Sequence, residues 1–174
     1  MTTTVESTRQ EKQLVVFDLA MEAYGVDIGA VREIIRMQDI TRVPRTQEFV
    51  EGVINLRGKV IPVVDLRKRF GLVVSEQTAD NRIVVVDIGG QDIGVVVDAV
   101  TEVLRITTDI IEPPSSVITS ADSDYLLGIA KLESGMIILL DLERVLTDEE
   151  KSSLSEELDA DDQVADGSEK VHGS

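Results

Sequence analysis

The chain contains an internal duplication, and this feature limits its possible folds more than any other. Residues 15–36 can be placed over residues 84–105 at a constant shift of 69, without a gap, and nine of the twenty-two positions are then identical. After a seven-residue insertion the match resumes at a shift of 76. The identical pairs are Val15/Val84, Val16/Val85, Asp18/Asp87, Gly25/Gly94, Val26/Val95, Ala30/Ala99, Val31/Val100, Glu33/Glu102, Arg36/Arg105, Gly52/Gly128, Leu56/Leu132, Ile61/Ile137, Asp65/Asp141 and Leu66/Leu142. Such a repeat indicates two copies of one structural unit.

Each copy predicts the same order of elements: two strands, a short helical or crossover segment, a third strand, and a hairpin that ends in Asp-Leu. Short strands without a long helix favour a small closed β-barrel, because closure removes exposed strand edges. We therefore expect two pseudo-symmetric barrels, one from each half of the sequence, at about 13–75 and 82–147. The elements predicted in the first half are strands at Leu14–Leu19, Tyr24–Ile28 and Ile40–Val43 and a short helix at Ala30–Arg36.

The segment Gly52–Leu66 consists of two apolar runs separated by a polar turn. Asn55 and Gly58 are residue types that tolerate positive φ, so the segment predicts a β-hairpin with Arg57 at its tip. Pro62 lies in the second arm of this hairpin. Because proline cannot donate to a β-ladder, we expect that arm at a sheet edge or a bulge.

The duplication also separates structural from functional candidates. Residues that match between the halves are expected to serve the shared fold, whereas surface residues that differ are candidates for function. At the hairpin tip, Asn55-Leu-Arg-Gly58 stands over Lys131-Leu-Glu-Ser134, so the sign of the tip charge is reversed. Arg57 is therefore a candidate binding residue, and an ordinary exposed turn arginine is the alternative.

The composition argues against catalysis and against a membrane span. The chain has no cysteine, and its one histidine, His172, lies three residues from the end of the sequence. A disulfide, a thiolate metal site, a Ser/His/Asp triad and a histidine-based metal cluster are therefore not available. The longest purely apolar runs have five residues, far fewer than the ~18 that a transmembrane helix needs. We expect a cytoplasmic protein without a metal or a cofactor. A pair of carboxylates for acid–base catalysis is the alternative that the composition leaves open, although every candidate Asp lies in a duplicated turn.

The distribution of charge argues against further partners. The net charge is −16, and the residues after 147 include ten acids and two bases. Such a surface repels phosphate backbones and anionic lipids, so nucleic acid and membranes are not expected partners. Residues 1–12 predict a flexible N-terminus and residues 151–174 the end of a helix followed by an acidic, disordered tail. Thr147 to Glu150 resembles a capping box that starts this helix, which either covers the barrels or adds a contact surface.

Two further functions, phosphate binding and small-ligand binding, have less support in the sequence. The turn Gly89 to Gly94 resembles a phosphate-binding loop, but it links two predicted strands, so no helix N-terminus is available for a phosphate. A small-ligand-binding β-barrel remains an alternative, although only five Phe and Tyr residues are present to line a cavity.

The motifs along the chain closely resemble those of CheW, the chemotaxis coupling protein family. The resemblance covers about Gln13 to Glu150, which agrees with one domain at 13–150, and it implies a fold of two SH3-like five-stranded barrels. The motifs that carry it are Tyr24-Gly-Val-Asp-Ile28, Val31-Arg-Glu-Ile34, Gly52-Val-Ile-Asn-Leu-Arg-Gly58, Ile61-Pro-Val-Val-Asp-Leu66 and Gly94-Val-Val-Val-Asp98 with Val103.

This resemblance implies a non-catalytic adaptor. Proteins of the family connect the cytoplasmic tip of methyl-accepting chemoreceptors to the regulatory domain of the histidine kinase CheA, and a related scaffold of a non-motility pathway is the alternative. Carried over by position, the receptor contact falls on Val31, Glu33, Arg57 and Val103, with Gly52 close to that surface. Val31 is matched by Val100, so a packing role is its alternative.

Overall fold

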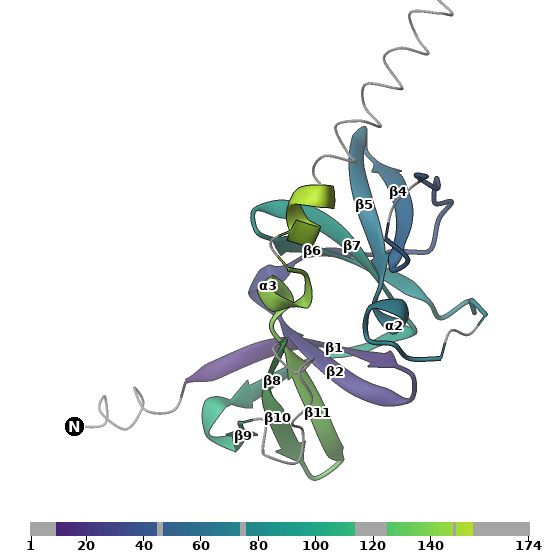
Figure 1. Cartoon of the computed structure of the whole chain (residues 1–174). Helices are drawn as coiled ribbons and strands as arrows, with labels where there is room; N and C mark the ends of the chain where they lie inside the picture. The colour runs from purple at the N-terminus through teal and green to yellow at the C-terminus, as the bar shows by residue number, and fades with distance from the viewer. Residues whose placement is uncertain (1–9, 45–46, 74–75, 114–124, 148, 155–174) are drawn as a thin grey trace, which may run out of the picture.

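The structure is a computed structural model that describes residues 10–44, 47–73, 76–113, 125–147 and 149–154. Two groups of strands are stacked, and the short helices α2 and α3 lie between them (Figure 1). The strands are β1 (Glu11–Leu19), β2 (Glu22–Asp27), β3 (Val31–Arg36), β4 (Val50–Leu56), β5 (Lys59–Asp65), β6 (Arg82–Ile88), β7 (Gln91–Val97), β8 (Ala99–Thr107), β9 (Ile111–Glu112), β10 (Leu126–Leu132) and β11 (Gly135–Leu140). The helical segments are η1 (Ile28–Ala30), α2 (Leu66–Arg69), η2 (Thr108–Ile110), α3 (Leu142–Val145) and residues 149–154.

The strands form two barrels, as the duplication predicts, but each barrel contains strands from both halves. A six-stranded sheet has the order β8-β1-β2-β11-β10-β9, and a five-stranded sheet has the order β3-β6-β7-β5-β4. The β1–β2 hairpin therefore joins strands of the second half, and the matching β6–β7 hairpin joins strands of the first half. This exchange differs from the expectation that each half would form its own barrel. A repeat cannot reveal it, because a hairpin that pairs with its own copy or with the other copy has the same sequence pattern.

Both barrels are closed by the segment that follows the crossover strand. Beyond β3, the N–H and C=O of Thr41 bond to Val53 on β4, and beyond β8, β9 pairs with β10. In each barrel a glycine lets the closing segment come close to the backbone of the neighbouring strand, and the two glycines occupy equivalent positions of the repeat. A Cβ atom at Gly52 would lie 2.1 Å from the carbonyl oxygen of Thr41, and one at Gly128 would lie 2.5 Å from that of Glu112. The duplicated glycines are therefore required for closure.

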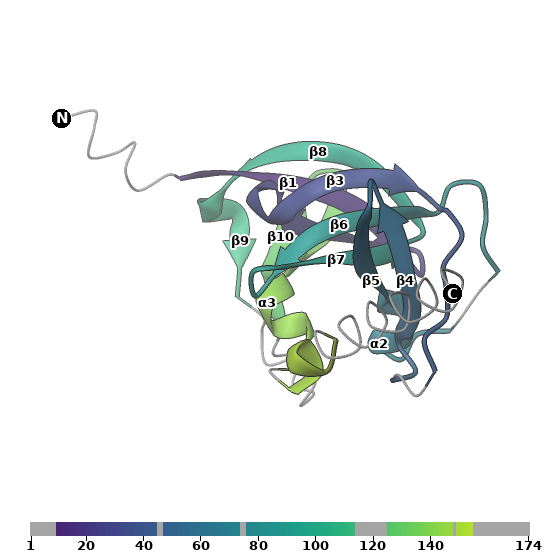
Figure 2. The ribbon, with the colours of Figure 1, turned by 90° about the horizontal axis from the view of Figure 1, so that it is seen from above.

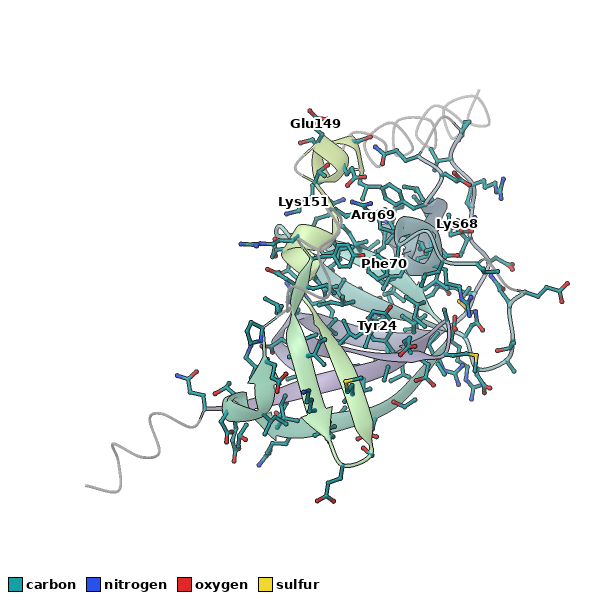
Figure 3. The ribbon with its side chains drawn as sticks, turned by 60° about the horizontal axis from the view of Figure 1, so that its bottom comes forward. Tyr24, Lys68, Arg69, Phe70, Glu149 and Lys151 are labelled. Atoms are coloured by element: carbon teal, nitrogen blue, oxygen red, sulfur yellow. The ribbon has the colours of Figure 1, made fainter. Side chains whose placement is uncertain are left out.

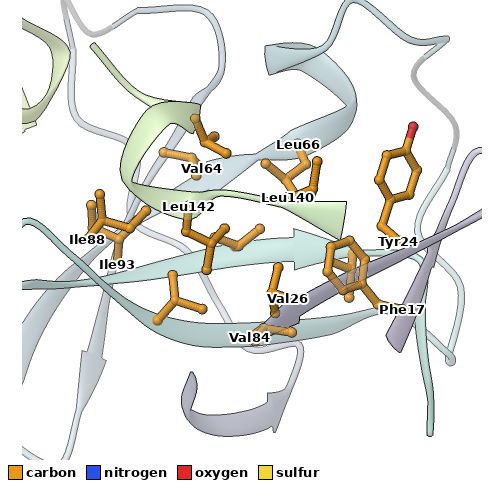
Figure 4. Packing of buried hydrophobic residues seen from close by; sticks show 14 of the residues in the cluster. Phe17, Tyr24, Val26, Val64, Leu66, Val84, Ile88, Ile93, Leu140 and Leu142 are labelled. Atoms are coloured by element: carbon orange, nitrogen blue, oxygen red, sulfur yellow. The ribbon is translucent and has the colours of Figure 1, made fainter. Parts of the chain in front are cut away.

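The apolar core has three parts. One cluster fills the six-stranded barrel and includes Leu14 and Val16, and a second fills the five-stranded barrel and includes Ile83 and Val85. The largest cluster lies between the barrels and includes Phe17, and Figure 4 shows its packing. Strands β1, β6 and β7 contribute to a barrel interior with one face and to the inter-barrel cluster with the other, which explains their nearly continuous apolar sequences.

The prediction of a helix at Ala30–Arg36 is wrong. Only residues up to Ala30 are helical, in η1, and Val31–Arg36 forms β3, which pairs antiparallel with β6. The apolar residues in this segment also fit a strand, and pairing with β6 decides between the two periods. A β-bulge between Val31 and Glu33 further obscures the alternation. The predicted strand at Ile40–Val43 is reduced to the bridge at Thr41.

Pro62 does not mark a sheet edge, because β5 lies between β4 and β7. Its cross-strand neighbour Val53 uses its N–H and C=O to bond Thr41 on the other side. The parallel pairing with β7 begins only at Val63. Pro62 therefore occupies a position where neither neighbouring strand requires its missing N–H.

Residues at the ends of the chain differ in part from expectation. The predicted flexible N-terminus, 1–12, includes Glu11 and Lys12, which belong to β1, and residues 1–9 lie outside the described ranges. The capping box is confirmed, because Thr147 N–H donates to the Glu150 carboxylate and Glu150 N–H donates to the Thr147 hydroxyl. The end of the predicted helix, through about Leu158, and the predicted acidic tail also lie outside the described ranges.

Closure through Gly52 can be tested by substitution. Gly52→Ala places a methyl group against the Thr41 carbonyl at a φ of 142°, and we expect it to lower the free energy of unfolding by roughly 3 kcal/mol. Gly135→Ala is the matched control, because Gly135 has the same φ of 142° but no atom within 4 Å of the added Cβ. Urea unfolding measures both. An equal loss in the two variants would show that backbone strain, not the contact with Thr41, requires the glycine.

Candidate functional site

The β4–β5 hairpin ends in a two-residue turn. Arg57 and Gly58 both have positive φ, 53° and 84°, as a type I′ turn requires. Asn55 does not take positive φ as its residue type had suggested. Its side-chain oxygen instead accepts a hydrogen bond of 2.8 Å from the Gly58 N–H. An arginine rarely adopts the left-handed conformation that Arg57 has here, which makes this tip a candidate functional feature.

The tip of this hairpin is held to the neighbouring strands by ion pairs. The guanidinium of Arg57 donates to the carboxylate of Glu33 on β3, and Lys59 lies 2.9 Å from the carboxylate of Asp92 on β7. The hydrogen bond and charge of Glu33 raise the pKa of Arg57. The Arg57 side chain is still 73% exposed. Its charge is therefore oriented by Glu33 and remains accessible to a partner.

The apolar candidates lie on β3 and β8, the matched strands of the two barrels. Val31 is half-buried and packs against the inter-barrel cluster, and Val100 packs there in the same way. This contact favours the packing alternative for Val31, without excluding it from the edge of a surface. Val103 is 54% exposed on β8. Figure 2 shows β3 and β8 along the same side of the molecule.

Ile34 is an exposed residue that the sequence analysis missed. It is 40% exposed on β3, and the shift of 69 matches it to Val103. In strand β3, Ile34 points outward, whereas its neighbours Glu33 and Ile35 are partly buried. The match with Val103 was the available signal, since equivalent positions of a repeat have equivalent exposure. Gly52, by contrast, is buried, and its contact with Thr41 gives it a structural role.

A partly buried polar clamp joins the two barrels on one side. The Arg67 guanidinium on α2 donates to both oxygens of Asp98, which links β7 to β8, and Asp98 also accepts the Ala20 N–H at 2.9 Å in the β1–β2 turn. Burial opposes ionisation of Asp98, but the hydrogen bonds from Arg67 and Ala20 and the arginine charge outweigh it and hold its pKa below the usual value. The clamp therefore fixes the β1–β2 turn of one barrel against α2 of the other.

The matching turn of the second half is held differently. Gly89 corresponds to Ala20, and its N–H donates to the Glu143 carboxylate on α3. Glu143 occupies the position that corresponds to Arg67. Each barrel thus anchors the first hairpin turn of the other through a carboxylate, which is Asp98 in one case and Glu143 in the other.

The segment around residue 150 completes the connection between the barrels. Arg69 on α2 donates to the Val145 carbonyl at 2.9 Å and lies 3.3 Å from the Glu150 carboxylate. Leu154, which is 2% exposed, packs into the inter-barrel cluster. Figure 3 shows Arg69, the last residue of α2, and Phe70, which follows it, on the side of α2 towards this segment. The helix predicted after Thr147 therefore packs against the barrels over its described residues.

A row of aromatic rings runs beside this connection. Phe17, Tyr24, Phe70 and Tyr125 follow one another, with ring centroids 6.0, 6.0 and 4.5 Å apart. Burial, followed by the charges of Tyr125 and Glu22, raises the pKa of Tyr24. Four of the five aromatic residues therefore pack against one another within the protein.

Neither a metal centre nor a membrane-spanning helix is found in the described part of the chain. There, His, Cys, Asp and Glu side chains form no group of three or more that could hold a metal ion. Among the same residues, no helix is long and apolar enough to cross a membrane.

Comparison with known proteins agrees with this architecture. The CheW-like domain matches residues 13–150. The chain belongs to the CheW family. It is 37% identical over 142 residues to the chemotaxis protein CheW of Klebsiella aerogenes, covering 80% of this chain and 84% of the relative. It is 33% identical over 143 residues to the CheW of Thermotoga maritima, covering 82% and 93%.

A solved CheW structure has the same fold. The crystal structure of the scaffolding protein TtCheW from Thermoanaerobacter tengcongensis superposes with a TM-score of 0.75 at 46% identity, covering 81% of this chain and 96% of that one. The chain is therefore a CheW-type chemotaxis scaffold protein with the two-barrel CheW fold.

The polar clamp predicts a pH-dependent loss of stability in Arg67→Met. The variant leaves the half-buried Asp98 carboxylate without its cation, and we expect the free energy of unfolding at pH 7 to fall by roughly 2 kcal/mol. Because the pKa of Asp98 is lowered in the folded state, its stabilising effect is present above the unfolded-chain value of about 3.9 and is lost as the pH falls through the folded value.

The difference between wild type and Arg67→Met should therefore shrink below about pH 4. Urea unfolding from pH 3 to pH 7 measures it. Arg144→Met is the matched control, because Arg144 is an exposed arginine on α3 with an ion pair of 3.5 Å. A difference that is independent of pH would show that Arg67 acts by packing alone.

Proposed function

We propose that the protein is a chemotaxis adaptor that binds both the cytoplasmic tip of a methyl-accepting chemoreceptor and the regulatory domain of a CheA-type histidine kinase. Membership of the CheW family supports this role. The single observation that carries the receptor part is the Arg57–Glu33 pair, which holds an exposed guanidinium at the tip of the β4–β5 hairpin.

The proposed receptor surface consists of Val31, Glu33, Ile34, Arg57 and Val103, and Gly52 lies beneath it. A receptor tip presents α-helices, and a helix can bury its apolar residues against Ile34 and Val103. Arg57 then pairs with an acidic residue of the helix and sets its register. Glu33 keeps Arg57 oriented before the encounter, which reduces the ordering that binding requires.

The proposed kinase contact is between barrels, since the kinase regulatory domain shares the fold in this family. Such a contact requires the two barrels to keep a fixed relative position. The Arg67–Asp98 clamp and the Arg69 contacts with Val145 and Glu150 supply that rigidity. The adaptor in this view has no catalytic step, and its output depends on which partners it holds together.

The receptor proposal predicts that Arg57→Glu weakens binding without unfolding the protein. The reversed charge repels both Glu33 and an acidic receptor residue, and we expect the Kd for a receptor-tip fragment to rise about tenfold or more. Isothermal titration calorimetry measures the Kd, and circular dichroism checks the fold. The matched control is Arg144→Glu, an arginine of similar exposure on α3 outside the proposed receptor surface, which should bind like wild type.

A double charge reversal separates two roles of Arg57. Glu33→Arg combined with Arg57→Glu restores an intramolecular ion pair with opposite orientation. If Arg57 only stabilises the hairpin tip, receptor binding returns to the wild-type value. If Arg57 contacts the receptor, binding stays weak. Wild-type binding in Arg57→Glu itself would contradict the assignment.

The kinase contact is tested by titrating the protein with the regulatory domain of a CheA-type kinase from the same genome. We expect saturable one-to-one binding that Arg57→Glu leaves unchanged, because the two partners use different surfaces. Failure of the wild-type protein to bind either partner would contradict the adaptor function.

A further inference from the structure

Two arginines face each other on neighbouring strands of the five-stranded sheet. Arg36, the last residue of β3, and Arg82, the first residue of β6, are directly opposite in the antiparallel ladder. Directly opposite residues have Cβ atoms about 4.5–5.5 Å apart on the same face of the sheet, and like charges in such a pair are destabilising. The arrangement therefore lowers the stability of the folded protein unless an acid lies nearby.

Within the described part of the chain, no carboxylate is paired with either arginine. Arg36 is exposed, and Arg82 donates to two backbone carbonyls just before β6, at 2.8 Å each. Asp39 and Asp80 lie close in the sequence, but neither forms an ion pair with these arginines. Arg42, beyond the end of β3, is the other unpaired arginine among the described residues. Those with a carboxylate oxygen at 3.7 Å or less are Arg32, Arg57, Arg67, Arg69, Arg105 and Arg144.

The equivalent position of the other barrel does not contain two arginines. There Arg105 on β8, which matches Arg36 at the shift of 69, lies opposite Gln13 on β1. Arg105 also has the Glu11 carboxylate at 3.7 Å. A neutral residue opposite the arginine is therefore sufficient for the fold, and the presence of Arg82 requires another explanation.

The arginine pair lies beside the proposed receptor surface. Ile34, two residues before Arg36 on β3, is opposite Val84, which belongs to the inter-barrel cluster. Residues two apart in a strand share a face, so Arg36 and Arg82 continue the face that presents Ile34. Val103 is the counterpart of Ile34 on β8, and β3 and β8 lie along the same side of the molecule (Figure 2). A helix that covers these two apolar residues therefore comes close to the arginine pair.

We propose that Arg36 and Arg82 together bind one carboxylate on a helix of the receptor tip. This inference rests on the proposed receptor function and adds a specificity determinant to it. Two guanidinium groups can share a carboxylate through charge-assisted hydrogen bonds, and the added negative charge offsets the repulsion between them. In a helix that runs along β3, the acid lies about one turn from the residue that covers Ile34, because two strand residues span about 6.6 Å and a helical turn about 5.4 Å.

The first test measures the Kd of a receptor-tip fragment by isothermal titration calorimetry for Arg36→Gln, Arg82→Gln and the double variant. Each single change should raise the Kd roughly fivefold, and the double change only slightly more, because either substitution disrupts one shared site. Arg144→Gln, which removes an exposed arginine on α3, is the control and should bind like wild type. If the wild-type protein binds and the double variant binds equally well, the inference fails while the adaptor function stands. If the wild-type protein does not bind, both fail.

A double-mutant cycle identifies the carboxylate. The acidic residues of the receptor fragment are changed one at a time to their amides, and each fragment is titrated into the wild-type protein and the double variant. One change should raise the Kd roughly fivefold for the wild-type protein and have no further effect on the double variant. If every change has the same effect on both proteins, the arginines do not bind a receptor carboxylate.

The stability of the free protein provides a readout that a structural role would not give. The Arg36 side chain makes no hydrogen bond or ion pair with the described residues, so Arg36→Gln chiefly removes its repulsion with Arg82. The urea midpoint should be equal to that of wild type or higher, although receptor binding is weaker. A lower midpoint would show that Arg36 serves the fold and would overturn the inference.

The acidic end of the chain is the other source of carboxylates. The residues after Leu154 include seven acids and one base. A full-length variant with these seven acids changed to amides should bind the receptor fragment with a Kd within about twofold of wild type. Tighter binding by this variant, absent when both arginines are also changed to Gln, would assign the arginine pair to the chain's own acidic end and overturn the choice of the receptor.

Discussion

The apolar core between the barrels is the constraint on which the rest of the structure depends. Strands β1, β6 and β7 are apolar on both faces, so a single barrel can bury only half of their side chains. Stacking the barrels buries the side chains on the other face of these strands. Each fully buried aliphatic or aromatic side chain contributes roughly 1.5–3 kcal/mol to the free energy of unfolding. The short helices and the polar clamp around Arg67 lie at the edge of this core and hold its two layers in one orientation. The proposed receptor surface, which spans β3 and β8, depends on that orientation.

The two-barrel architecture could be predicted from the sequence, but the pairing of strands within each barrel could not. The repeat predicted two barrels, the Asn55–Gly58 segment predicted the hairpin, and Thr147 with Glu150 predicted a helix start. The exchange of hairpins was not predictable, since copies of one unit offer each strand two equivalent partners. The helix predicted at Ala30–Arg36 failed because the apolar spacing fitted two periods and only the tertiary partner, β6, distinguished them. The positive φ appeared at Arg57 and not at Asn55, because the ladder register places the two-residue turn after Leu56.

The candidate surface was partly predictable by comparing equivalent positions of the two halves. The contrast between Arg57 and Glu133 at the two hairpin tips identified a residue that the fold does not require. Ile34 was hidden by the helix prediction, although its match with Val103 was visible in the sequence. The identities at Gly52/Gly128 and Asp65/Asp141 serve closure and capping. Glu33 is matched by Glu102 and is still part of the proposed receptor surface, so identity between the halves does not by itself separate structural from functional residues.

The exchanged hairpins also determine when the chain can fold during its synthesis. Leu14 on β1 pairs with Leu104 on β8, so the first hairpin lacks its neighbour until more than half of the chain has been made. Until then its apolar faces and an unpaired edge are exposed to other nascent chains. Such distant pairings also slow folding, because a long loop must close before the contacts form. We therefore expect the two barrels to assemble together, late in synthesis, and as a single cooperative unit.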